Sequence, residues 1–194
     1  YAHLPLVLGA DRSKLSKRKG ALPLTDYRDM GYLPEALLNT MALIGWNPGT
    51  EQEIFSLDEL IKVFDLSKVQ KGGAIFNPIK LDWINKEYIK KLTQDEQLKN
   101  IEIWLNDSGI KAKDEIIKKL MPIILDRISK WSDIKTMAEA GELAYFFKTP
   151  EYDKEGLIWK KLRDSKDRFV ITKEYIEKTM ELLNSISESD FNHE

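Results

Sequence analysis

Helix-start signals recur along this chain of 194 residues and constrain it to a mainly helical fold. Two segments, Ser56-Leu57-Asp58-Glu59 and Thr93-Gln94-Asp95-Glu96, are capping boxes, in which a hydroxyl and a glutamate three residues later satisfy each other's backbone N–H groups. Asn77-Pro78 combines a capping amide with a proline suited to the first helical position. Apolar residues at helical spacing follow each signal, so we predict that all three begin helices.

Further helices are expected on both sides of these signals. A short helix is predicted between an N-cap at Thr25 and a stop at Gly31, and a mostly buried one between Pro34 and Gly45. The apolar stripe of that second helix comprises Leu33, Leu37, Met41 and Ile44.

The second half of the chain also has helical spacing. Residues 116–128 keep it although Pro122 is expected to kink or divide the helix, and Gly141 is expected to end the next one. One helix is predicted over residues 157–162, and Thr172 is predicted to cap the last, with a hydrophobic staple beside it.

A basic loop follows the one strand-like segment, residues 4–8, which we expect to be buried and to end at Gly9. Five of the eight residues from Arg12 to Lys19 are basic, and a second glycine, Gly20, closes the segment, which is typical of a mobile loop. Flexible lysine side chains can follow charge that develops on a phosphate chain. The alternative is a solvated loop that binds polyanions nonspecifically.

Composition excludes several classes of protein and site. The formal net charge is −2, which argues against a general nucleic-acid coat but permits local basic patches. The chain has no cysteine and two isolated histidines, so no metal site is predicted, and absence of thiols fits a reducing compartment. No apolar run reaches the ~18 residues of a membrane span, no secretory signal precedes the strand, and no glycine-rich nucleotide-binding motif is present.

The flanks of the basic loop, residues 1–9 and 20–24, resemble the signature loop of class I aminoacyl-tRNA synthetases. Leu15 and Arg18 replace the commoner Met and Ser of that loop, a variation usual in the glutamyl branch. The resemblance continues through three further blocks, residues 27–39, 43–46 and 75–85. Together these blocks look like the middle of a bacterial-type glutamyl-tRNA synthetase, with a strong match over about the first ninety residues.

This resemblance implies two domains. Residues 1–90 would carry the signature loop, a short strand segment and a connecting domain like the one that contacts the tRNA stem. Residues 91–194 would form a helical anticodon-binding domain, which we expect to be incomplete at its C-terminal end. Nothing here resembles the β-barrels with which glutaminyl enzymes read the anticodon, and truncated tRNA-modifying paralogues lack a helical domain of this kind.

The resemblance also implies roles in the loop. Lys17 would bind the phosphates of ATP and stabilise the transition state of glutamate activation, and Lys14 would assist it. Leu15, Ser16 and Arg18 complete the implied phosphate-binding segment, with the Ser16 hydroxyl either orienting a phosphate or capping a turn.

Five residues are candidates for tRNA contact. By resemblance, Lys80 and Asn85 would touch the inside of the tRNA elbow. Arg127, Lys130 and Trp131 lie in a segment resembling the anticodon-facing helices, and such side chains can read or stack on bases. The alternative is an ordinary surface arginine beside a buried tryptophan.

Other aromatic and basic residues have simpler interpretations. Trp46 and Trp83 are expected to lie in the core. Lys160, Lys161 and Arg163 are expected to form a solvated helix face.

A protein of this family joins glutamate to its tRNA with ATP and Mg²⁺, through a glutamyl-adenylate. The partners implied are the glutamate tRNA, with the glutamine tRNA left open, and the expected state is a cytoplasmic monomer. The chain lacks a His-x-Gly-His element and a nucleotide-binding βαβ pattern, so we predict that it does not catalyse aminoacylation alone. A tRNA-binding module without catalytic function is the first alternative, and a helical interaction domain without an RNA role is the second.

Overall fold

The computed structural model describes residues 4–147 and 153–186 and is mainly helical, as the sequence predicts. The chain forms two compact units, Tyr1–Phe147 and Lys148–Glu194. The first unit extends well past residue 90, so it includes parts of both domains expected from the sequence. The division at residue 90 itself stays a prediction.

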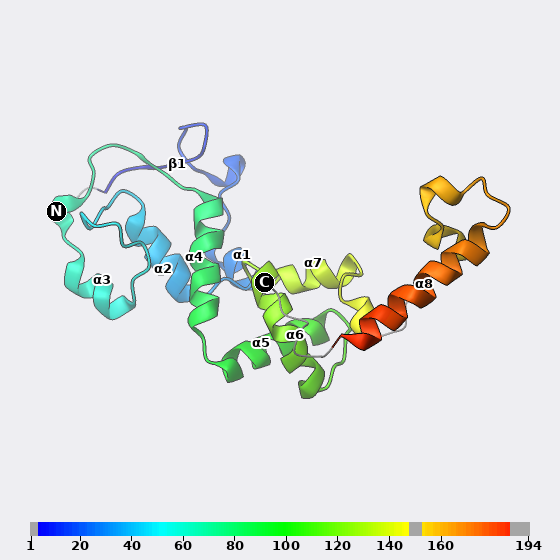
Figure 1. Ribbon diagram of the computed structural model, residues 1–194. Coiled ribbons are helices and arrows are strands. Elements are labelled where there is room, and N and C mark those ends of the chain that lie inside the picture. Colours follow the sequence, from blue (N-terminus) through cyan, green and yellow to red (C-terminus); the bar gives the residue numbers. More distant parts are fainter. Residues whose placement is uncertain (1–3, 148–152, 187–194) are drawn as a thin grey trace. The chain divides into compact units, whose positions relative to one another are not determined.

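Seven α-helices lie in the first unit as described (Figure 1). They are α1 (Leu24–Asp29), α2 (Pro34–Leu43), α3 (Leu57–Val63), α4 (Pro78–Lys91), α5 (Gln94–Asp107), α6 (Asp114–Arg127) and α7 (Asp133–Glu139). Short 3-10 turns occur at η1 (Lys17–Lys19), η2 (Leu66–Lys68) and η3 (Ala144–Phe146). Helix α4 packs against α2, and α5 packs against α6 and α7.

The predicted helix starts are confirmed. In the first capping box the Ser56 hydroxyl accepts the Glu59 N–H at 3.3 Å while the Glu59 carboxylate accepts the Ser56 N–H at 2.7 Å. Thr93 and Glu96 make the same reciprocal pair at the start of α5. These backbone hydrogen bonds to the carboxylates lower the pKa of both glutamates. The Asn77 side chain likewise caps α4 by accepting N–H groups of its first turn.

Two strands of two residues each, β1 (Val7–Leu8) and β2 (Ala74–Ile75), pair in parallel, with Val7 opposite Ala74. The prediction of a buried strand over residues 4–8 is wrong, because the Leu4 and Leu6 side chains are exposed. Parallel strands are normally covered on both faces.

The apolar stripe predicted for α2 is only partly buried. Met41 is 63% exposed, whereas the buried face of the helix consists of Ala36, Asn39 and Thr40. Asn39 can be buried because both ends of its side-chain amide are hydrogen-bonded: the NH2 group donates to the Glu53 carbonyl at 2.8 Å, and the oxygen accepts the Phe55 N–H at 2.6 Å. The fully buried face of the helix is therefore partly polar, and of the predicted stripe Met41 is exposed while Leu33 packs against the larger core cluster.

Two predicted helix ends, at Gly31 and Gly141, are confirmed, whereas the predicted N-cap at Thr25 is wrong. Helix α1 begins at Leu24 without a side-chain cap, so Thr25 is not the N-cap, but the stop at Gly31 is confirmed by a φ of 77°. Pro122 lies inside a continuous α6 and does not divide it. Gly141 follows α7 with a φ of 77°, as expected.

The largest core cluster is formed by helices α5, α6 and α7 and the segments beside them. Trp131 belongs to it and is 2% exposed, and Trp46 belongs to a smaller cluster with Phe55 and Leu60. Trp83 is 44% exposed, so the expectation that it is core is wrong. Helix α4 buries the face of Leu81, Ile84, Asn85 and Ile89 instead.

The second unit contains α8 (Arg168–Ser185) and two 3-10 turns, η4 (Lys154–Leu157) and η5 (Lys160–Leu162). The single helix predicted over residues 157–162 is therefore wrong. Thr172 lies inside α8 and does not cap it, because the helix begins one turn earlier, where the Ile171 N–H donates to the Asp167 carbonyl. No helix in the described parts of either unit is long and apolar enough to cross a membrane.

Candidate functional site

The lysine loop, defined here as residues 9–20, is tied to the preceding strand by backbone hydrogen bonds. The Leu15 N–H donates to the Val7 carbonyl at 2.9 Å, which ties the loop back to β1. At its start the Gly9 N–H donates to the Ser13 carbonyl at 2.9 Å. The loop is therefore a turn that folds back beside the strand that precedes it.

Two of the candidate basic side chains lie on a 3-10 turn at the end of this loop. Ser16 occupies the N-cap position of η1 without a side-chain capping bond, and Gly20 ends the turn with a φ of 84°. The Ala21 N–H donates to the Ser16 carbonyl at 3.0 Å and closes the turn. The Ser16 hydroxyl is thus not the cap of η1, and its role toward a phosphate stays a prediction.

Three cations of the loop face solvent. Lys14, Lys17 and Arg18 are exposed, and within residues 4–147 and 153–186 none of the three has an ion-pair partner. Exposed cations are suited to bind a phosphate chain.

A second polar group, which we call the polar junction, joins three segments that are distant in sequence. The Tyr32 hydroxyl donates to Asp82, and Lys130 Nζ lies 3.8 Å from Asp82 and 3.1 Å from Asp133. The Lys130 ammonium also lies 5.8 Å from the centre of the Tyr32 ring. Burial and the neighbouring Asp82 raise the pKa of Tyr32.

Asn85 connects two further segments and is completely buried. Its side-chain oxygen accepts the Leu33 N–H at 2.8 Å, and its amide donates to the Ser129 carbonyl at 2.6 Å. With 0% exposure, Asn85 offers no surface to RNA, contrary to the contact expected. Lys80 is partly exposed and forms an ion pair with Glu53.

The three anticodon candidates do not share one surface. Arg127 is exposed and its guanidinium lies 3.0 Å from Glu142 Oε2. Lys130 forms ion pairs within the polar junction. Trp131 is buried in the core, as the alternative interpretation of a buried tryptophan predicts. Arg127 is therefore the accessible residue of the three.

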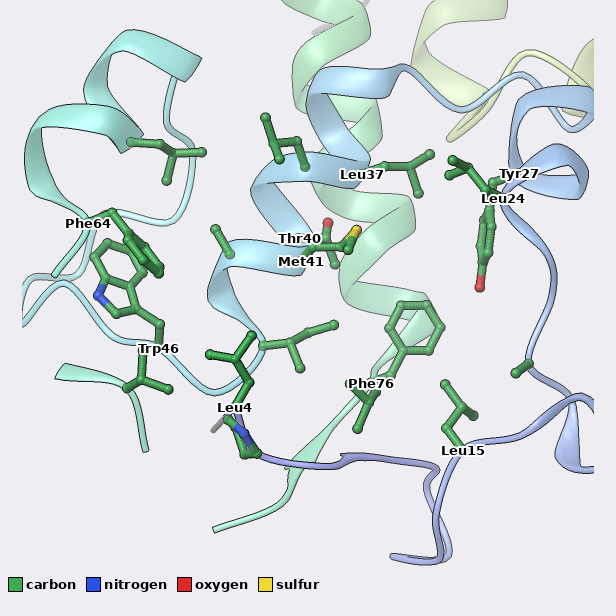
Figure 2. Close-up of a pocket in the computed structure, with 18 of the residues that line it drawn as sticks. Leu4, Leu15, Leu24, Tyr27, Leu37, Thr40, Met41, Trp46, Phe64 and Phe76 are labelled. Carbon is green, nitrogen blue, oxygen red and sulfur yellow. The ribbon is translucent and has the colours of Figure 1, made fainter. Parts of the chain in front are cut away.

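Sequence reasoning missed a large apolar groove beside the lysine loop (Figure 2). Its volume is about 880 Å³, and its walls include Leu37 and Met41 of α2, which lie between Trp46 and Phe64 on one side and Tyr27 and Phe76 on the other. The signal was visible in the sequence as the stripe predicted for α2, but spacing alone does not distinguish a core face from an uncovered one.

A metal site is not apparent in the described part of the chain. Over residues 4–147 and 153–186, no three His, Cys, Asp or Glu side chains are grouped closely enough to hold a metal ion.

Comparisons with known proteins agree on one family. Residues 1–83 match the family model for class I tRNA synthetases (E and Q), catalytic domain. A glutamate–tRNA ligase of Syntrophus aciditrophicus is 42% identical over 153 residues, which cover 79% of this chain and 32% of that protein. The ligase of Aquifex aeolicus is 40% identical over 184 residues, covering 93% and 37% respectively.

Solved structures give the same result. The crystal structure of a glutamate tRNA ligase from Elizabethkingia meningosepticum, in complex with its amino acid, matches with a TM-score of 0.72 and 30% identity. The match covers 96% of this chain and 38% of that one. The chain thus spans roughly a third to two fifths of the length of the relatives that it matches.

Proposed function

Because this chain is a relative of the glutamate–tRNA ligases, we propose that it supplies tRNA binding and the phosphate-contacting lysine loop to an enzyme of that kind. The observation that carries the proposal is the lysine loop itself. It lies within the segment matched to a catalytic domain and presents Lys14, Lys17 and Arg18 to solvent without acidic partners among the described residues.

In the proposed reaction, ATP activates the glutamate carboxylate. The carboxylate oxygen attacks the α-phosphate, the glutamyl-adenylate forms and pyrophosphate leaves; a terminal ribose hydroxyl of the tRNA then displaces AMP. Negative charge develops on the leaving pyrophosphate, and Lys17, assisted by Lys14, would stabilise it there. Mg²⁺ would neutralise phosphate charge when bound with ATP.

For tRNA we propose two contacts that the structure leaves accessible. Arg127 would reach bases of the anticodon loop, since a guanidinium can both stack and donate in pairs. Lys80 would contact backbone phosphate. Asn85 and Trp131 are buried and are not part of this proposal. The proposed partner is the glutamate tRNA, bound by a cytoplasmic monomer, and the glutamine tRNA is the comparison substrate.

We expect Arg127→Ala to weaken binding of the glutamate tRNA about tenfold, the loss typical of one good base contact. It should also reduce discrimination against the same tRNA with a changed anticodon. Lys135→Ala is the matched control, because Lys135 is similarly exposed and also pairs with a glutamate, Glu139. Fluorescence titration at two salt concentrations measures both effects.

Three results would separate the interpretations of that titration. Equal losses for the two variants would mean that Arg127 contributes only general positive charge. Salt-sensitive binding without anticodon discrimination would mean that the chain contacts only the phosphate backbone of the tRNA. No binding at low salt would favour the interaction domain without an RNA role.

The loop proposal has its own test. We expect no ATP–pyrophosphate exchange from this chain alone. In a polypeptide that joins it to the catalytic domain of a relative, Lys17→Ala should lower exchange about 100-fold, the cost of removing one transition-state donor. Lys71→Ala is the control, since Lys71 is an exposed lysine within the same matched segment.

Exchange by the isolated chain would contradict the prediction that it is inactive. Equal activity of the Lys17 and Lys71 variants would contradict the catalytic role of the loop. That result, together with intact tRNA binding, would favour the tRNA-binding module without catalytic function.

A further inference from the structure

The proposed function uses the Arg127 side chain but gives no role to the carboxylate that faces it. Arg127 Nη1 donates to Glu142 Oε2 at 3.0 Å, and both side chains are about half exposed. Within the part of the chain that the structure describes, no other group accepts a hydrogen bond from this guanidinium or forms an ion pair with it. Glu142 is therefore the group that sets the charge around Arg127.

Both members of the pair are carried by backbone that the core holds in place. Arg127 is the last residue of α6 and directly precedes Ile128, which is completely buried. Glu142 follows the end of α7, where its N–H donates to the Met137 carbonyl at 3.0 Å. Leu143, the next residue, is 1% exposed and belongs to the same core cluster as Ile128. The pair therefore joins two points of one packed unit.

The guanidinium keeps an open donor edge while it holds Glu142. An arginine presents its N–H donors in a planar fork, and the contact with Glu142 uses Nη1. The Nε and Nη2 groups form another edge of the fork, and none of the described residues accepts a hydrogen bond from them. Such an edge can donate a pair of hydrogen bonds to a base. A base contact would therefore add to the ion pair and would not have to break it.

A backbone phosphate is a different case, because it competes with Glu142 for the same positive charge. An arginine without a partner can bind a phosphate of any tRNA, and such contacts carry no sequence information. An arginine that a carboxylate already neutralises gains less from a phosphate, since a second anion must approach the first or replace it. Glu142 therefore weakens nonspecific binding more than it weakens base recognition.

We propose that Glu142 is a specificity-determining residue for tRNA, which acts by neutralising Arg127. It keeps the guanidinium available to an anticodon base and withholds it from backbone phosphate. The inference rests on the proposed function, in which Arg127 contacts the anticodon loop. Glu142 acts through Arg127 and needs no contact of its own with RNA.

Glu142→Ala is expected to lower discrimination between the glutamate tRNA and the same tRNA with a changed anticodon about threefold, within the range of one exposed ion pair. The change should come from tighter binding of the changed tRNA. Because Arg127 can then reach a phosphate, the logarithm of that binding constant should fall more steeply with the logarithm of salt concentration, by about one in slope. Glu142→Gln should behave in the same way, since it removes the charge and keeps the length of the side chain. Fluorescence titration of the full chain over a series of salt concentrations measures these effects.

Glu139→Ala is the matched control, because Glu139 is also an exposed glutamate but pairs with Lys135. It removes the same charge, so it should strengthen binding of both tRNAs equally and leave discrimination unchanged. Combining Glu142→Ala with Arg127→Ala should give the same discrimination as Arg127→Ala alone. Equal effects of the Glu139 and Glu142 variants would show that Glu142 contributes only general negative charge, and would overturn the inference.

Two further results would overturn the inference and leave the proposed tRNA contact intact. One is a loss of discrimination in Arg127→Ala with none in Glu142→Ala, even where the latter unfolds at a lower temperature, because the ion pair would then be only structural. The other is full discrimination in Glu142→Gln when Glu142→Ala has lost it, because a hydrogen bond and not the charge would then be required. Unchanged discrimination in Arg127→Ala would instead contradict the proposed contact itself, and the inference with it.

Discussion

Replacing Gly31 with alanine is expected to lower the free energy of unfolding by about 2–5 kcal/mol. Gly31 has a φ of 77°, a conformation that costs an alanine about 1–2 kcal/mol. A Cβ there would also lie 2.6 Å from Trp131 Cβ and 2.8 Å from Trp104 Cζ2. Overpacking of a filled core typically adds about 1–3 kcal/mol.

Gly109 provides a matched control for this substitution. Its φ is also 77°, but a Cβ built on it meets no atom within 4 Å. Gly109→Ala should therefore cost only the conformational part, about 1–2 kcal/mol. Urea unfolding followed by circular dichroism measures both variants. Equal destabilisation of the two would show that the tryptophans move aside and that the contact at Gly31 carries no cost.

Asn85→Ala is expected to lower the free energy of unfolding by about 2–6 kcal/mol, because it leaves two buried groups unpaired and each costs about 1–3 kcal/mol. Those groups are the Leu33 N–H and the Ser129 carbonyl, and the lost side-chain volume adds to the cost. Asn85→Asp keeps an acceptor for Leu33 but turns a carboxylate oxygen toward the Ser129 carbonyl, so it should also destabilise.

The control is Asn100→Ala on α5, whose amide donates to the Glu96 carbonyl at the helix surface. It should change stability by less than about 0.5 kcal/mol. Thermal unfolding and tRNA titration are measured on the same samples. If Asn85→Ala weakened tRNA binding tenfold with unchanged unfolding, Asn85 would be an RNA contact after all and its buried role would be rejected.

Both substitutions act where distant segments meet. Gly31 and Leu33 precede α2, Asn85 lies on α4, and Ser129 and Trp131 follow α6. The backbone adds its own links here, since the Ser132 N–H donates to the Met30 carbonyl at 3.1 Å. The predicted connecting and anticodon-binding domains therefore share one packed unit at this junction.

Functional prediction from the sequence was most successful where the signal is a linear motif. The basic loop and its flanks indicated the ligase family, to which the comparisons also lead. Individual contacts were less predictable: Lys130 and Trp131 are neighbours in sequence, yet one joins an ion-pair network and the other the core. No sequence motif predicts the roles of Asp82 and Asn39, whose side chains form hydrogen bonds with segments distant in sequence.

What the sequence determined by itself is the local structure. Capping boxes at Ser56 and Thr93, the Asn77-Pro78 start and the stop at Gly31 depend on atoms within a few residues of one another, so they form as predicted. Only the tertiary structure decided which apolar surfaces are buried. The α2 stripe and Trp83 have the composition of core residues, but burial depends on a partner surface distant in sequence. Asn39 and Asn85 are buried because their side-chain amides have hydrogen-bond partners, whereas Leu37 and Met41 of α2 line a groove.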